Sequence, residues 1–251
     1  MKLISLMYHD IETTRTRLRY AFSIGEFKEH LAAIKNTVGH GPAIPGDSGA
    51  SGFALTFDDG HVGWLKAAEA LNELRWKASF FIVTKGIGRP GALDRSAIRQ
   101  LAGMGHVIGS HTVDHPALSG KDDAFILDQW TRSKAALEDI LGQAVTTGSV
   151  PGGFYSPRVA RAADAAGLKH LFTSEPVVPT WEVGGCRVLG RFTLLNGMSR
   201  GTVARIVGGD RSEHARHYLA WRVKKAVRSF MPRAYLALRD RVNKVRSGRL
   251  P

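Results

Sequence analysis

The sequence is poor in the features that mark exported or membrane-spanning proteins. It contains a single cysteine, Cys186, so no disulfide can form within the chain, which agrees with a reducing compartment. No segment approaches the ~18 consecutive apolar residues that a transmembrane helix needs. The start, MKLISLMYHDIETT, has only a short apolar run, whereas a secretory signal needs a longer one and a small-residue cleavage site. We therefore expect a cytoplasmic protein.

Acidic residues are scarce in the C-terminal segment. Residues 211–251 hold twelve Lys and Arg against two Asp and Glu, a balance of +10, so the other residues carry only +3 of the net +13. Apolar Leu219, Val223 and Val227 recur at helical spacing, and a similar series resumes after Pro232. The pattern predicts two basic amphipathic helices that bind an anionic membrane surface or pack against the rest of the chain. Nothing resembles a motif that reads nucleic acid, so nucleic acid is not the expected partner.

Apolar, β-rich runs alternate with helical patterns before this segment. The predicted strands are Leu3–Met7, Phe53–Phe57, Ser79–Val83, His106–Gly109, Thr146–Val150, His170–Thr173 and Arg187–Leu189. The predicted helices are Ile24–Val38, Val62–Leu74, Asp94–Met104, Ala124–Leu141 and Pro157–Ala166. This alternation predicts a parallel α/β sheet, either open or closed into a barrel. In both forms, active sites gather at the C-terminal ends of the strands.

Polar or metal-binding side chains follow nearly every predicted strand. His111 and His115 lie four residues apart, a spacing that lets two imidazoles converge on one ion. Either Asp58 or Asp59 would add a carboxylate and leave coordination positions open for water and substrate. The two adjacent carboxylates repel each other, and a dication would offset that repulsion while the second carboxylate takes a proton from metal-bound water. Alone, DDG is typical of a turn and HxxxH of solvated or buried histidines; together, beyond strand ends, they predict a metal site.

The motif TFDDG at 56–60, followed about fifty residues later by SHTVDHP, resembles the polysaccharide deacetylase family (the NodB-type, carbohydrate esterase 4 group). MYHDI near the start and VPGGFYS at 150–156 are also similar to members of that family. The resemblance covers about residues 3–195. It implies a distorted (β/α)7-type barrel, which we expect to span residues 1–200. From its charge and spacing we expect residues 201–251 to form a basic helical extension. The resemblance also implies metal-dependent removal of N-acetyl groups from amino sugars.

The resemblance assigns roles to the residues of the first two motifs. It implies that Asp58 is the general base and that Asp59, His111 and His115 hold one divalent metal ion. Two histidines and one aspartate suit zinc, which is the expected ion, but also cobalt, nickel or manganese.

Two positions depart from the family's motifs. Many members have an arginine at the start of the third motif that orients the base, where this sequence has Ser149. Many also have a late histidine that acts as general acid, where VLGRFTLL has Arg191, a candidate substrate contact. We expect His9 to deliver the proton, because it follows the first strand and belongs to a YHDI motif. The resemblance to a branch of the family with an early YHxI motif implies the same role.

The third motif is expected to form the loop that meets the substrate carbonyl. It contains Pro151, Gly152, Gly153 and Tyr155. A backbone N–H of Gly152 or Gly153 would stabilise the oxyanion. Tyr155 would line a sugar groove or belong to the core.

The expected function is a metal-dependent hydrolase that removes an N-acetyl group from an acetamido sugar. The substrate would be a glycan or, if the basic tail binds the inner face of the membrane, a lipid-linked precursor of cell-envelope or exopolysaccharide synthesis. Two alternatives stay open. The same residues would serve an esterase or a hydrolase of non-sugar amides, and the two departures would suit a catalytically degenerate membrane-associated scaffold.

Overall fold

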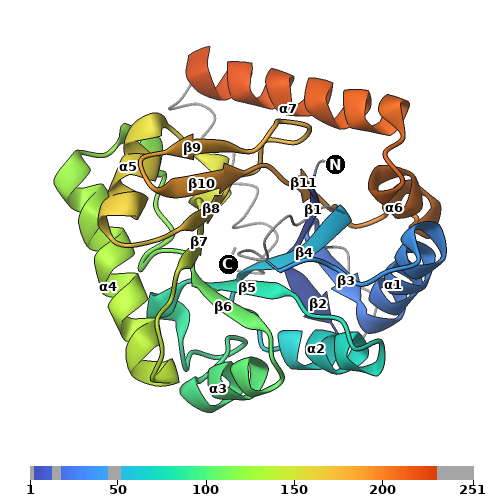
Figure 1. The fold of residues 1–251 in the computed structure, drawn as a ribbon, viewed down its shortest axis with the longest axis horizontal. Helices are drawn as coiled ribbons and strands as arrows, with labels where there is room; N and C mark the ends of the chain where they lie inside the picture. The colour runs from blue at the N-terminus through green and yellow to red at the C-terminus, as the bar shows by residue number, and fades with distance from the viewer. Residues whose placement is uncertain (1–2, 13–17, 45–51, 231–251) are drawn as a thin grey trace, which may run out of the picture.

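A computed structural model of the protein describes residues 3–12, 18–44 and 52–230. Its main sheet has the strand order β11-β1-β4-β5-β6-β7-β8-β10-β9 (Figure 1). The strands are β1 (Leu3–Tyr8), β4 (Gly52–Asp59), β5 (Ser79–Ile82), β6 (Val107–Ser110), β7 (Thr147–Ser149), β8 (His170–Phe172), β9 (Trp181–Val183), β10 (Cys186–Leu189) and β11 (Phe192–Thr193). All neighbours pair in parallel except β9 and β10. Two short strands, β2 (Asp10–Glu12) and β3 (Ala21–Ser23), pair with each other.

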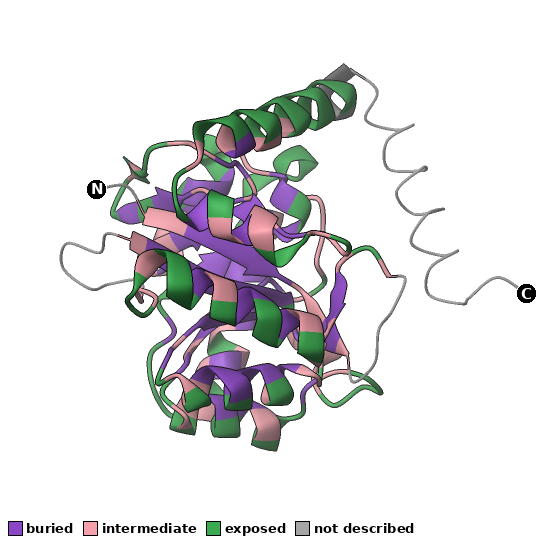
Figure 2. Ribbon diagram, turned by 90° about the vertical axis from the view of Figure 1, so that its right-hand side faces the viewer, coloured by how far each residue is buried: buried purple, intermediate pink, exposed green. Residues whose placement is uncertain are grey.

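Helices surround the sheet on its outer side (Figure 1). They are α1 (Ile24–Val38), α2 (Trp64–Glu73), α3 (Arg95–Gly103), α4 (Asp123–Leu141), α5 (Pro157–Ala165), α6 (Arg200–Val207) and α7 (Arg211–Phe230). Figure 2 shows buried strands inside and exposed outer faces on the helices. This layering is the one that a parallel sheet with crossover helices produces.

A very short piece of chain joins β11, at one end of the sheet order, to β10, the second strand from the other end. β10 pairs with β8 and β11 pairs with β1, yet only Gly190 and Arg191 separate β10 from β11. The sheet therefore curls into a distorted barrel, as predicted. A Cβ atom at position 190 would collide with the carbonyl oxygen of Glu175, so only glycine fits at this position.

The predicted strands and helices are all present, with ends shifted by at most two residues. Local signals explain the boundaries. Ser23 and Glu26 form a capping box at the start of α1, and the Asp94 side chain accepts a hydrogen bond from Ala97 N at the start of α3. The sequence pattern missed the short strands β2, β3, β9 and β11 and the helix α6, which have too few residues to show a clear period.

Aromatic packing fills the barrel wall and its interior. Phe57 on β4 stacks on Phe80 of β5, with ring centroids 4.7 Å apart, and both are fully buried between the sheet and α2. Inside the barrel, Phe81 and Phe172 lie 5.2 Å apart. The Arg191 guanidinium lies over both of these rings, at 5.7 Å and 5.6 Å from their centroids.

The C-terminal helices extend the packed part of the chain. α6 begins at the expected domain boundary, and its residues Val203, Ile206 and Val207 lie in the core, so the packed core continues past residue 200. α7 is one helix through Phe230, and the expected second helix after Pro232 lies outside the described residues. Within the described part of the chain, no helix combines the length and the apolar character that crossing a bilayer demands.

Candidate metal centre

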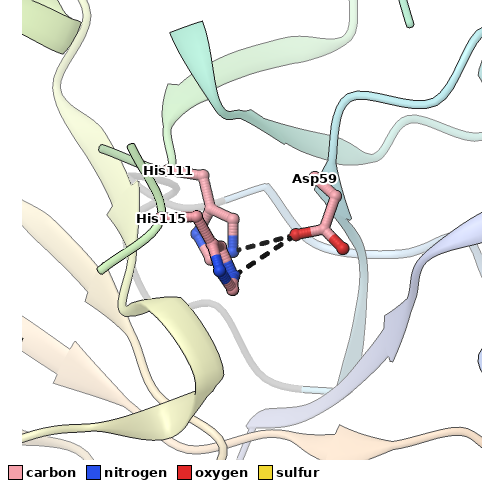
Figure 3. Close-up of side chains that lie close together, drawn as sticks. All are labelled: Asp59, His111 and His115. Atoms are coloured by element: carbon pink, nitrogen blue, oxygen red, sulfur yellow. Dashed lines mark ion pairs between the residues drawn. The ribbon is translucent and has the colours of Figure 1, made fainter. Parts of the chain in front are cut away.

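Three predicted ligands meet at the carboxyl edge of the barrel (Figure 3). Asp59 Oδ1, at the end of β4, lies 3.4 Å from His111 Nε2 and 3.5 Å from His115 Nε2, both in the loop after β6. One donor atom from each residue lies within 4.8 Å of the others. A carboxylate oxygen and two imidazole nitrogens are a donor set for divalent zinc or a similar ion. The structure thus brings together the three residues that the sequence proposes.

Backbone geometry around this set is unusual. Asp59, Thr112 and His115 all have positive φ angles, of 95°, 65° and 57°. Non-glycine residues adopt this region at a cost, and such residues concentrate at functional sites. The His115 N–H donates to Thr112 Oγ1 at 3.1 Å, which holds the tight turn between the two histidines.

A buried glutamine holds the loop that carries the two histidines. The Gln129 side chain, on α4, is 1% exposed. Its oxygen accepts hydrogen bonds from the backbone N–H groups of Val113 and Asp114, both at 3.0 Å, and its amide nitrogen donates to the Asp114 carboxylate. Gln129 therefore fixes the loop between His111 and His115, a role that the sequence analysis did not assign.

Hydrogen bonding sets the orientation of His111. Its Nδ1 lies 2.8 Å from the backbone carbonyl oxygen of Ser149, so Nδ1 donates and Nε2 is left to face Asp59. Burial lowers the pKa of His115 to about 4, with His111 adding to the effect and Asp59 opposing it. At neutral pH the His115 imidazole is therefore uncharged and can offer a lone pair.

The electrostatics at His111 favour a positive charge. Its Nε2 lies 3.7 Å from Asp58 Oδ2 as well as 3.4 Å from Asp59 Oδ1. Burial alone lowers the pKa of His111, but the two carboxylates raise it by more, so the pKa is raised overall. A divalent cation between the same groups would satisfy this preference. The residues present fit the expected metal ion.

Asp58 is held by a buried hydrogen-bond network. Arg191 NH1 lies 2.7 Å from Asp58 Oδ1, and Arg191 NH2 lies 2.8 Å from Asp58 Oδ2. The Ser149 hydroxyl donates to Oδ2 at 2.8 Å, and the guanidinium also donates to Thr56 Oγ1 and to the Thr173 carbonyl oxygen. Burial raises the pKa of Asp58, but the charge of Arg191, the charge of His111 and the hydrogen bonds from Arg191 together outweigh it, and the pKa is lowered overall.

Arg191 is not the substrate contact that the sequence suggests. Its side chain is 0% exposed, and the guanidinium is occupied by the network around Asp58. The family resemblance leads us to expect an arginine at position 149, where this chain has the smaller Ser149. Arg191, in the β10–β11 connection, supplies a guanidinium to Asp58 instead and also bonds to Ser149 Oγ. The sequence shows an arginine at a strand end, but a strand end does not tell whether the side chain points into the barrel.

His9 lies at the same edge as the Asp58 network. Its ring is 4.8 Å from that of Tyr20, and its buried Nδ1 has no hydrogen-bond partner among the residues that the structure describes. Burial and nearer groups have the larger effects on the pKa values of Asp58, Asp59 and His115, and the charge of His9 lowers all three as well. This location is compatible with the predicted proton donor, which stays a prediction.

The third motif forms a tight turn after β7. Pro151–Gly153 is a 3-10 turn in which the Gly153 N–H donates to the Val150 carbonyl oxygen at 3.1 Å. The Gly153 N–H is therefore already bonded, so it is not available to an oxyanion as we expected. The expected role of the Gly152 N–H stays a prediction. The Tyr155 hydroxyl accepts a hydrogen bond from Trp181 Nε1 at 2.9 Å. This pair connects the turn to β9.

Comparison with known proteins follows the same motifs. The model of the family described as polysaccharide deacetylase matches residues 46–171, half of the chain. The chain belongs to the polysaccharide deacetylase family. The matched segment includes Asp58, Asp59, His111, His115 and the turn at Pro151–Gly153.

Named relatives of this deacetylase domain include two bacterial proteins. YxkH of Bacillus subtilis is 30% identical over 58% of this chain and 52% of its own length. A chitooligosaccharide deacetylase of Bradyrhizobium is 30% identical over 51% of this chain and 58% of its own length. The chain thus spans about half the length of the curated relatives it matches. The solved structure of the Streptococcus pyogenes deacetylase PplD has a TM-score of 0.73 over 82% of this chain and 98% of its own, at 21% identity, which shows a shared fold.

Proposed function

We propose that the protein is a metal-dependent hydrolase that removes N-acetyl groups from acetamido sugars. The observation that carries this proposal is the arrangement of a buried, ionised Asp58 beside the Asp59, His111 and His115 set. Membership of the polysaccharide deacetylase family and a relative named as a chitooligosaccharide deacetylase support the sugar substrate.

The metal-binding residues and the base divide the chemistry between them. A divalent cation on Asp59, His111 and His115 would supply Lewis acidity toward an acetamide carbonyl and would lower the pKa of water. Asp58 accepts a proton at its carboxylate when water adds to the carbonyl carbon. Arg191 keeps Asp58 ionised and fixes the plane of its carboxylate, because both oxygens accept bonds from one rigid guanidinium.

The leaving amine needs a proton once the C–N bond breaks. His9 is the proposed donor, since it lies at the same edge and has an unpartnered buried Nδ1 among the described residues. The products are acetate and the free amino sugar. A proton donor in the right place contributes about 10²–10⁴ in rate.

The natural substrate is proposed to be a glycan or a lipid-linked glycan precursor, of the kind used to build an exopolysaccharide. The relatives' names support an acetylated sugar chain, and the basic helix α7 motivates the lipid-linked form. An esterase would use the same residues, because ester and amide hydrolysis share the attack on a carbonyl.

Elemental analysis together with an acetate-release assay tests this proposal. The purified protein is expected to bind about one divalent ion per chain and to release acetate from N-acetylated chitooligosaccharides. Asp59→Ala and His111→Ala should lose both properties, whereas His40→Ala, on an exposed histidine, should keep them. Release of acetate from acetyl esters alone would identify an esterase. A protein with neither metal nor turnover, even after soaking with zinc or cobalt, would be a scaffold.

A further inference from the structure

Helix α7 has an inverted distribution of side chains. Its packed side carries histidines: the His214 and His217 rings lie 4.7 Å and 5.5 Å from the Phe192 ring, and His214 Nε2 donates to the Ile206 carbonyl oxygen. The opposite side carries Leu219 and two valines. A surface helix ordinarily buries its apolar side and exposes its polar side. The arrangement of α7 is the reverse.

The exposed apolar side chains form a continuous stripe. Leu219 is 64% exposed, Val223 56% and Val227 46%. Residues four apart lie above one another on one side of a helix, so the three side chains adjoin. In Figure 2 the outer side of α7 is exposed along most of its length. These residues are also the ones whose spacing the sequence analysis singled out.

Ion pairs on the packed side fix the direction in which the stripe points. Near the start of α7, Glu213 is 7% exposed and accepts bonds from Arg205 of α6 and from Arg216. More than three turns later, Lys225 Nζ lies 3.1 Å from Glu175 Oε1, in the segment after β8. These contacts, together with the His214 and His217 rings against Phe192, show which side of α7 faces the barrel. The apolar stripe is therefore held outward.

Basic side chains border the stripe. α7 contains six Lys and Arg and one acidic residue, Glu213, so its charge is +5. Arg216 and Arg222 lie three residues before and after Leu219, next to it on the helix surface. Both are exposed, but the Arg216 guanidinium is paired with Glu213. We define the α7 outer face as Leu219, Val223 and Val227 together with Arg222.

We propose that the α7 outer face binds an anionic lipid surface. Apolar side chains bordered by arginines suit insertion just below negatively charged headgroups. A second copy of the chain would bring two helices of equal positive charge together, which opposes that contact. The inference goes beyond the proposed deacetylation and does not depend on it.

The same contacts relate the docked helix to the catalytic edge. Glu175, which pairs with Lys225, follows β8 at the carboxyl end of the sheet, and the Glu175 N–H donates to Thr173 Oγ1. The Thr173 carbonyl oxygen in turn accepts from Arg191. The packed side of α7 is therefore linked, through Glu175 and Thr173, to the arginine that holds Asp58.

Vesicle sedimentation of the full chain tests the proposal. The protein is expected to bind vesicles of phosphatidylcholine with phosphatidylglycerol and not vesicles of phosphatidylcholine alone. The double variant Leu219→Ser, Val223→Ser should lower the partition coefficient by about tenfold or more, because two inserted side chains are lost. Arg222→Gln should lower it about threefold to fivefold and weaken its salt dependence.

Matched variants on another surface give the control. Leu127→Ser removes an aliphatic side chain that is 38% exposed on α4, and Arg99→Gln removes an exposed arginine on α3. Both should bind vesicles as the parent does. Equal binding by the double variant would overturn the proposal, since it would place the lipid contact elsewhere in the chain. Failure of the parent to bind, or a parent dimer that the double variant abolishes, would also overturn it.

Discussion

The edge of the barrel around Asp58 and the α7 outer face both depend on arginine but use it in opposite ways. Arg191 is 0% exposed and donates to Asp58, Ser149 and two further acceptors in one fixed arrangement. Arg222 is exposed and lies beside apolar Leu219. In the first region the guanidinium orders a single carboxylate, whereas in the second it adds to a diffuse positive field.

Burial is the physical origin of this difference. Two charges taken out of water attract each other strongly but lose their hydration, so such a pair persists only with good geometry and further hydrogen bonds. Exposed ion pairs contribute about 0–1 kcal/mol, because water and salt screen them. Loss of a buried arginine such as Arg191 should therefore lower the free energy of unfolding much more than loss of an exposed one such as Arg222. The following predictions test that contrast.

The largest effect is expected at the carboxylate that Arg191 orders. Asp58→Asn should lower kcat/KM for an N-acetylated sugar by about 10²–10⁴, since the amide cannot accept the proton. The metal content should stay near that of the parent, because Asp58 is not one of the three proposed ligands. Steady-state kinetics and elemental analysis on one preparation check both. Loss of the metal together with the activity would instead make Asp58 a ligand.

The next largest effect is expected from removal of the buried Arg191 guanidinium. Arg191→Met leaves Asp58 buried without its partner, which should lower the free energy of unfolding by about 3–5 kcal/mol. Arg187→Met changes an arginine on β10 whose side chain is 50% exposed, and should cost about 1 kcal/mol or less. Urea unfolding measures both. Equal costs for the two variants would contradict the contrast between buried and exposed arginines.

A double variant sharpens that result. Asp58→Asn combined with Arg191→Met removes both charges, so its cost should be smaller than the sum of the two single costs. Strict additivity would mean that the pair, joined at 2.7 Å and 2.8 Å, contributes no coupling.

A buried group without an opposite charge extends the comparison. Burial, together with the nearby Lys77 charge, lowers the pKa of His106 to about 4, while an unfolded histidine titrates near ~6.5. Between these values the unfolded chain binds more protons, so this contribution to stability is complete above about pH 6.5 and is lost as pH falls to about 4. It amounts to about 3 kcal/mol at most.

The free energy of unfolding against pH measures this contribution. His106→Gln should flatten the slope between about pH 6.5 and 4 by up to one proton. His40→Gln, on an exposed histidine, should leave the slope as in the parent. A slope that His106→Gln does not change would show that another buried histidine carries the dependence.

The smallest effect on stability is expected on the α7 outer face. Leu219→Ser should change the free energy of unfolding by no more than about 0.5 kcal/mol, because the side chain is already 64% exposed. Leu171→Ala, at a fully buried position of β8, should cost about 2–5 kcal/mol. Thermal or urea unfolding compares the two leucines. A large cost at Leu219 would mean that the stripe is packed rather than available to a lipid surface.

Local patterns account for what could be predicted of the fold. α1 begins and ends at the predicted residues, because Ser23 and Glu26 cap its start and Gly39 adopts a left-handed conformation at its end. β9 was missed because three residues paired antiparallel at the edge of the sheet show no period. The three candidate ligands were predictable, since Asp59, His111 and His115 follow strands whose carboxyl ends meet at one edge.

The alternation of strands and helices, the family motifs and the three candidate ligands can be recognised in the amino-acid sequence. These depend on neighbours along the chain, where spacing and residue type carry the information. The folded structure was needed to show that Arg191 serves Asp58, that Gln129 holds the histidine loop and that the α7 stripe points outward. Each of these depends on which side chain points into the barrel or away from it. That direction is set by packing between residues as far apart as 58 and 191, which no local pattern records.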